Sequence, residues 1–168
     1  MTSAFLEELR AHNSTDERPT WVYIAYDQLT DACGPLAEHD PDQLGIVLIE
    51  NQRKGNRRPY HQQKLALILA NMRHFAIEQA RRGVRVEYLF GNDSYASLLR
   101  RPIQKHGAMI AMRPAERELR QDLQPLVDES KLSWVEHAGW LTTRTQFEEA
   151  CGEPPWRMDA FYRRVRQD

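Results

Sequence analysis

Two carboxylates and a group of cations in the first third of the sequence are of the types that bind ligands or take part in catalysis. Asp27 follows an apolar run, and Glu50 ends another. Paired carboxylates can accept hydrogen bonds from a ligand or hold a metal ion for phosphoryl chemistry. The connection after Glu50 carries four cations, which can flank a ligand, contact phosphate or form a solvated loop: Arg53, Lys54, Arg57 and Arg58.

The elements that must position these residues can be predicted from apolar runs and their spacing. Five short runs rich in aromatic and β-branched residues predict buried strands, at residues 20–26, 44–50, 84–90, 108–112 and 132–137. Apolar residues at helical spacing predict a long helix over residues 60–82. Further helices are expected before residue 20, from Pro114 to about 125–128, and over the closing segment. Another is expected over residues 93–105, where Pro102 should kink or shorten it. A capping box at 143–146 predicts the start of one more.

Strands that alternate with helices predict an α/β fold with parallel strands. We expect an open five-stranded parallel sheet with helices on both faces, Rossmann-like, over residues 20–168, preceded by an N-terminal extension over residues 1–19. Ligands of such sheets bind beyond the carboxyl ends of the strands, where the strand order reverses. Asp27 and Glu50 are therefore expected on one rim, which the positive N-terminus of the long helix would also face.

The composition excludes several classes of protein. The 168 residues suffice for about one domain, and 41% hydrophobic with 28% charged residues is typical of a globular protein. A formal net charge of -1 argues against strong binding of nucleic acid by the surface as a whole. Two cysteines are too few for an iron–sulfur cluster, which needs about four. No signal segment or membrane span is present, so we expect a cytoplasmic protein with no membrane partner.

Sequence motifs of the common catalytic and nucleotide sites are absent. No GxGxxG follows the first predicted strand, and no GxxxxGK[ST], GxSxG or metal-ligand histidine spacing occurs. We therefore assign no catalytic residue and no metal ligand. From the residues alone three functions stay open: a ligand-binding domain, a small nucleotide-binding or metal-assisted hydrolase that uses Asp27 and Glu50, and a protein-interaction module.

Several phrases of the sequence, in their order and spacing, resemble one family. They are YDQL at 26–29, LIEN at 48–51, YHQQKLALILANMRHFA at 60–76, RVEYLF at 85–90, RPAERELRQDL at 113–123, LTTRTQF at 141–147 and RMDAFYRRVR at 157–166. Together they resemble the amino-terminal domain of the prokaryotic photolyase-related proteins, the iron–sulfur bacterial cryptochromes and photolyases.

This resemblance implies a light-harvesting antenna domain. In the family the domain can hold a second chromophore, typically 6,7-dimethyl-8-ribityllumazine, which passes excitation energy to FAD. FAD and a 4Fe-4S cluster lie in a helical carboxy-terminal region, to which the resemblance does not extend, and full-length relatives are DNA photolyases or light sensors. By resemblance, Asp27 and Glu50 bind the chromophore, and the domain is not catalytic in isolation. Its expected partners are a helical FAD-binding domain, in cis or in trans, and DNA through weak contact.

Two residues depart from the family's pattern. The family's Gly before Asp-Gln-Leu is Tyr26 here, and a tyrosine ring would fill space that glycine leaves open. Arg113 precedes Pro114 where the family tends to have Glu, which changes the charge at the rim of the fourth strand. Both departures bear on chromophore binding, and neither bears on the fold.

Overall fold

The structure is a computed structural model that describes residues 3–56 and 61–166. It divides into two compact units, Met1–His137 and Ala138–Asp168. The first unit contains the sheet and its helices, and the second contains two short helices. Two of the four cations after Glu50, Arg57 and Arg58, lie outside the described residues.

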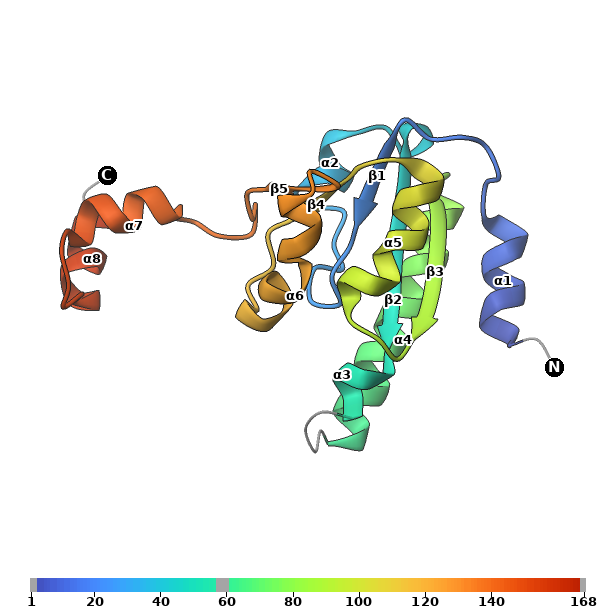
Figure 1. Cartoon of the computed structure of the whole chain (residues 1–168), viewed down its shortest axis with the longest axis horizontal. Coiled ribbons are helices and arrows are strands. Elements are labelled where there is room, and N and C mark those ends of the chain that lie inside the picture. The colour runs from blue at the N-terminus through green and yellow to red at the C-terminus, as the bar shows by residue number, and fades with distance from the viewer. Residues whose placement is uncertain (1–2, 57–60, 167–168) are drawn as a thin grey trace. The chain divides into compact units, whose positions relative to one another are not determined.

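The first unit is built on a five-stranded sheet in which every pairing is parallel (Figure 1). The strands are β1 Thr20–Tyr23, β2 Leu44–Asn51, β3 Arg85–Gly91, β4 Met109–Met112 and β5 Leu132–Val135. Their order is β3-β2-β1-β4-β5, so it reverses between β1 and β4. The predicted α/β fold is confirmed, although β1 and β5 end earlier than their apolar runs.

Helices cover both faces of this sheet. They are α1 Ala4–His12, α2 Pro35–Glu38, α3 Gln52–Asn56, α4 Gln62–Arg81, α5 Tyr95–His106 and α6 Arg117–Asp128, with a short 3-10 turn, η1, at Pro41–Gln43. In Figure 1, α5 lies in front of the sheet and α4 behind it. No described helix combines the length and the apolar character that crossing a membrane requires.

Two prolines correct the predicted helix bounds. Pro102 does not shorten α5, which continues to His106, because Pro102 is buried on the packed face with Leu99 and Ile103. That packing offsets the hydrogen bond that a proline removes. Pro114 does not open α6, which begins three residues later at Arg117.

Alternate residues of β2 build the two halves of the core. Val47 and Ile49 pack with α5 and α6 on one face, whereas Ile46 and Leu48 pack with α1 and α4 on the other. This follows from the two-residue period of a strand, which sends successive side chains to opposite faces. By the same alternation Glu50 belongs to the α4 face.

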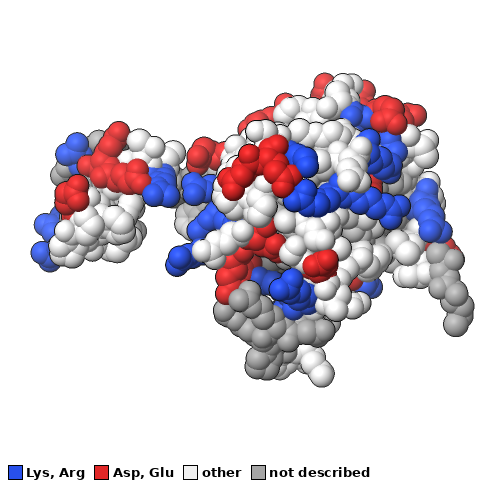
Figure 2. Space-filling model, in the orientation of Figure 1, with Lys and Arg blue, Asp and Glu red and all other residues white. Residues whose placement is uncertain are grey.

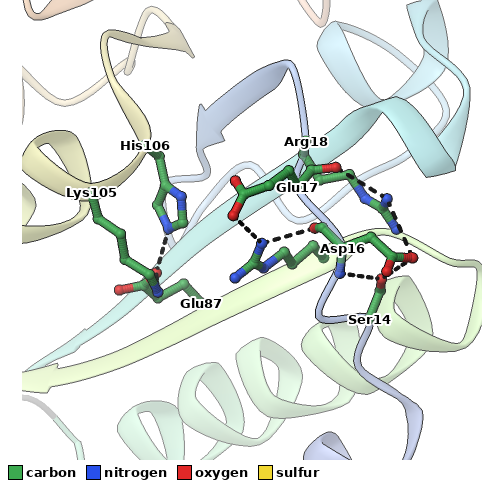
Figure 3. Close-up of polar contacts among 8 residues, drawn as sticks. Ser14, Asp16, Glu17, Arg18, Glu87, Lys105 and His106 are labelled. Carbon is green, nitrogen blue, oxygen red and sulfur yellow. Dashed lines mark hydrogen bonds and ion pairs between the residues drawn. The ribbon is translucent and has the colours of Figure 1, made fainter.

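The segment before β1 is fastened to the outer strand β3. Asn13 mimics a neighbouring strand, because its Oδ1 accepts from Val86 N–H at 2.8 Å and its Nδ2 donates to Val86 O at 2.7 Å. Figure 3 shows the adjoining polar contacts, including Glu87 with its partners Lys105 and His106. The Asn13 hydrogen bonds satisfy backbone groups of Val86 that the edge strand would otherwise leave unpaired.

The second unit consists of α7 Arg144–Cys151 and α8 Met158–Val165. The predicted capping box is confirmed: Gln146 N–H donates to Thr143 Oγ1, and Thr143 N–H donates to Gln146 Oε1. The two helices meet through Phe147, whose ring centroid lies 5.1 Å from that of Phe161 and 5.7 Å from that of Trp156.

Gly45 is required by the close approach of Trp21 from the neighbouring strand. A methyl group at Gly45 would lie 2.5 Å from the indole of Trp21, which is 2% exposed and stacked on His106. Because overpacking a core costs about 1–3 kcal/mol, we expect Gly45→Ala to lower the free energy of unfolding by about that amount in urea denaturation. Gly55→Ala is the control, since its methyl would meet Leu65 at an ordinary 3.5 Å. Equal stability of the two variants would contradict this role.

Candidate functional site

The loops after β1 and β4 are joined where the strand order reverses. Gln28 is buried, and its Nε2 donates to the backbone oxygen of Met112 at 3.1 Å. The Tyr26 hydroxyl donates to Oε2 of Glu116 at 3.0 Å. In open α/β sheets this is the position at which ligands usually bind. Here side chains of the two loops bridge it.

Lys54 completes this bridge from the β2 side. Its ammonium group forms an ion pair with Oε1 of Glu116 and lies 5.4 Å from the centroid of the Tyr26 ring. Burial and the adjacent Glu116 carboxylate both raise the pKa of Tyr26 well above its usual value. Tyr26 is therefore a neutral hydrogen-bond donor. Of the predicted basic connection, Lys54 is held in an internal pair, whereas Arg53 is exposed.

Glu50 is buried, and side chains from α4 and β3 hydrogen-bond to its carboxylate. Arg73 of α4 donates to both of its oxygens, with Nη2 2.8 Å from Oε2, and the Tyr88 hydroxyl donates to Oε1 at 2.6 Å. Burial and the Glu50 carboxylate raise the pKa of Tyr88 far above its usual value, which keeps Tyr88 a donor. Glu50 thus lies against α4 and orients Arg73 and Tyr88.

Asp27 has a different environment. It is an exposed residue in the loop after β1, and partial burial of its carboxyl group raises its pKa above the ordinary 3.8. A backbone hydrogen bond opposes that shift, the Glu116 charge adds to it, and His137 and Lys54 oppose it more weakly. The two predicted site residues therefore differ in environment. Glu50 is buried and paired with Arg73, whereas Asp27 lies at the surface beside the bridge.

Two adjoining hollows open at the carboxyl end of β2. Both are lined by Asn51, Lys54 and Tyr95. Asn51 holds their junction together, because its Oδ1 accepts from Lys54 N–H and its Nδ2 donates to the backbone oxygen of Asp93. Neither Asp27 nor Glu50 is among the described residues that line either hollow.

The smaller hollow, the apolar hollow, has a volume of about 200 Å³. Its remaining walls are mostly apolar or aromatic: Tyr26, Ile49, Gly55, Lys64, Leu65, Ile68, Leu69 and Met72. The larger, the polar cleft, has a volume of about 650 Å³. Its remaining lining is mostly charged or polar: Arg53, Asn92, Asp93, Ser94, Glu118, Leu119 and Asp122. An apolar wall beside convergent polar groups is the usual form of a small-molecule site.

The apolar hollow is built in part from the apolar face of the predicted long helix. Leu65, Leu69, Met72 and Ala76 share one face of the predicted helix. In the structure Ala76 is buried in the core and Met72 is buried at the inner wall of the hollow, whereas Leu65, Ile68 and Leu69 are half-buried and form its other apolar walls on α4. The stripe extends one turn further than the packed part of α4.

Comparison with known proteins decides the family. A sequence model described as "Deoxyribodipyrimidine photo-lyase-related protein" matches residues 22–168. The chain belongs to this family. Within curated proteins, a (6-4) photolyase of Agrobacterium fabrum (strain C58) is 27% identical over 156 residues, which are 87% of this chain and 31% of that photolyase. The chain thus matches less than a third of the relative's length, and the predicted family resemblance is confirmed.

Within residues 3–56 and 61–166, no three side chains of His, Cys, Asp or Glu are grouped so that they could hold a metal ion. The apolar hollow and the polar cleft together form the candidate site.

The Glu50–Arg73 pair can be tested by removing either partner. Loss of one partner of a buried pair leaves an unsatisfied charge, and because the Arg73 side chain is 41% exposed we expect Arg73→Gln to cost about 1–3 kcal/mol. The double variant Glu50→Gln/Arg73→Gln should recover part of that loss, since the buried charge is gone. Urea denaturation of the two single variants and of the double variant measures the free energy of unfolding of each. A double variant whose loss equals the sum of the two single losses would contradict the coupling.

Asp27→Asn tests the environment of Asp27. Because the folded-state pKa is raised, the folded protein favours the protonated carboxyl group. That relative stabilisation is complete below the ordinary pKa of 3.8 and is lost as the pH rises through the raised value. We therefore expect Asp27→Asn to increase the Tm at neutral pH, with the difference shrinking below pH 3.8. Circular dichroism during heating measures it, and a lower Tm at neutral pH would show the opposite sign.

Proposed function

We propose that this chain is an antenna domain, which binds a light-harvesting chromophore and passes its excitation energy to a flavin in a photolyase-related protein. The domain performs no catalysis alone. The observation that carries this proposal is the apolar hollow next to the polar cleft at the carboxyl end of β2. Membership of the photolyase-related family supports it.

The shape and chemistry of 6,7-dimethyl-8-ribityllumazine match the two hollows. Its ring system is flat, with a methylated edge and a polar edge, and it carries a hydroxylated chain. The methylated ring suits the apolar hollow, where Ile49 and Met72 form walls and Lys54 supplies a donor. The ribityl hydroxyls suit the polar cleft, where carboxylates of Asp93 and Asp122 can accept hydrogen bonds.

Tyr26 takes a specific role in this proposal. Its ring lines the apolar hollow and is held by the hydrogen bond to Glu116 and by Lys54. A ring fixed in this way offers an aromatic surface on which a heteroaromatic ligand can stack, worth about 0.5–1.5 kcal/mol beyond burial. The Tyr26 ring therefore acts as a wall of the site, in place of the open space that glycine provides.

Asp27 and Glu50 lie near the proposed site but are not among the described residues that line it. Glu50 holds Arg73 of α4 and Tyr88 of β3 by hydrogen bonds. Asp27 lies in the loop that also carries Tyr26. We propose that both shape the chromophore site. Their substitution then changes affinity less than a substitution in the wall of the apolar hollow.

A helical FAD-binding domain, in cis or in trans, is the partner that the antenna function requires. The second unit supports such a partner, because several large apolar or aromatic side chains are more than half exposed there: Trp140, Leu141, Trp156, Met158 and Tyr162. Contact with DNA is weak in this proposal. Figure 2 shows basic and acidic side chains lying beside one another on the drawn face of the first unit, which does not favour a strong phosphate-binding surface there.

Titration of the purified chain with 6,7-dimethyl-8-ribityllumazine, followed by lumazine fluorescence anisotropy, tests the proposal. We expect saturable binding by the unchanged chain. Ile68→Trp should weaken it at least about tenfold by filling the apolar hollow. Leu67→Trp is the matched control, because Leu67 lies on the same helix but is 61% exposed and outside the hollow.

Two results would overturn the proposal: no binding by the unchanged chain, or equal binding by the Ile68→Trp and Leu67→Trp variants. Tyr26→Gly examines the wall separately. Weaker binding supports stacking on the ring, whereas tighter binding shows that the ring obstructs the ligand and contradicts its role as a wall.

A further inference from the structure

A third hollow lies between α6 and β5, beyond the position where the strand order reverses when counted from β2. Its volume is about 450 Å³. We name it the arginine hollow after the residues that line it: Arg113, Arg117, Arg120, Gln121, Gln124 and Trp134. None of the described residues that line it also lines the apolar hollow or the polar cleft. All of these residues belong to the first unit.

The positive charge of the arginine hollow is only partly compensated. Of the residues that the structure describes, no carboxylate forms an ion pair with Arg113 or Arg117. Elsewhere in the first unit arginines such as Arg73 and Arg100 are paired with glutamates. The guanidinium groups of Arg113 and Arg117 repel each other only weakly, because Arg117 is exposed and water screens the pair, and an anion placed between them removes that repulsion.

The position of Arg117 adds to this repulsion. Arg117 is the first residue of the twelve-residue helix α6, whose N-terminal end carries a partial positive charge. The N-cap residue Glu116 makes no capping hydrogen bond, because its carboxylate is engaged by Lys54 and Tyr26. The Arg120 guanidinium lies one turn on, and its Nη1 is held by the backbone oxygens of Pro114 and Ala115. Guanidinium groups and a helix N-terminus are the groups that bind phosphate in proteins.

The hollow also has an aromatic side. Trp134 of β5 is half-buried against the core, and its remaining surface lines the hollow. The amide groups of Gln121 and Gln124 lie there as well, with Gln124 Nε2 donating to Asp128. An indole provides a stacking surface for a base, and an amide can pair with a base edge. The volume falls within the range of about 300–1,000 Å³ of small-molecule sites.

We propose that the arginine hollow binds a nucleoside phosphate, with the phosphate against Arg113, Arg117 and Arg120 and the base against Trp134. A free nucleotide and the phosphorylated end of a single strand share this chemistry. The site is separate from the proposed chromophore site, so either can exist without the other.

Isothermal titration calorimetry of the whole chain with adenosine 5′-monophosphate tests this proposal. We expect saturable binding that is tighter than binding of inorganic phosphate or of adenosine, since each probe lacks one half of the ligand. Arg117→Gln should weaken nucleotide binding at least about tenfold. Arg101→Gln is the matched control: Arg101 is an exposed cation on α5 outside the hollow, and its loss should leave affinity unchanged. Trp134→Leu should remove the advantage of the nucleotide over inorganic phosphate.

Three outcomes would overturn the proposal: no nucleotide binding by the unchanged chain, equal weakening by Arg117→Gln and Arg101→Gln, or inorganic phosphate binding as tightly as the nucleotide. Far-ultraviolet circular dichroism of each variant shows that a loss of binding is not a loss of fold. A 5′-phosphorylated single-stranded oligonucleotide identifies the source of the ligand, and tighter binding of it than of the mononucleotide assigns the hollow to strand ends. Lumazine binding should be the same in Arg117→Gln as in the unchanged chain, which keeps this test independent of the antenna proposal.

Discussion

The contacts between the loop after β1 and the loop after β4 decide where this α/β sheet can hold a ligand. The usual crevice of such a sheet opens where the strand order reverses. Here Gln28 donates across that position to Met112, and Tyr26 and Lys54 meet on Glu116. Because these groups satisfy one another, opening the crevice would leave polar groups and a half-buried charge unpaired. The free volume lies instead to either side of the bridge.

This bridge also joins the loops that carry Tyr26 and Arg113, the two residues that the sequence resemblance marks as departures from the family's pattern. Tyr26 stands in the first loop and Arg113 in the second, and Gln28 hydrogen-bonds to the backbone oxygen of Arg113 at 3.3 Å. A tyrosine hydroxyl in a half-buried loop needs an acceptor, and Glu116 provides it. A carboxylate placed there needs a counter-charge, which Lys54 supplies from across the sheet. The Tyr26 side chain thus belongs to one set of mutual contacts, which Arg113 joins through its backbone oxygen.

The fold could be predicted from the sequence because its determinants are local. Apolar runs with strand composition and the spacing of the long helix give the five strands and their layers. Asn13 then pairs with the edge strand β3, and Gly45 makes room for Trp21 between neighbouring strands. Helix bounds at Pro102 and Pro114 could not be predicted, since tertiary packing and the β4 loop decide them. Sequence rules give the free energy that a proline costs a helix through a lost hydrogen bond, and packing against the rest of the fold determines whether that cost is offset.

The candidate site was less predictable, for a reason that particular residues make clear. The two-residue period of β2 places Glu50 on the α4 face, but its partner Arg73 lies 23 residues away and no local pattern identifies it. The net charge of the chain is equally unable to predict where an anion binds. A chain with formal net charge -1 has a nearly neutral surface on average, yet a small ligand responds to charge within a few ångströms. Many of the cations that the structure describes are paired with a neighbouring carboxylate, as Lys54 is with Glu116. Recognition of an anion therefore depends on cations without such a partner that the fold brings together, such as Arg113 and Arg117.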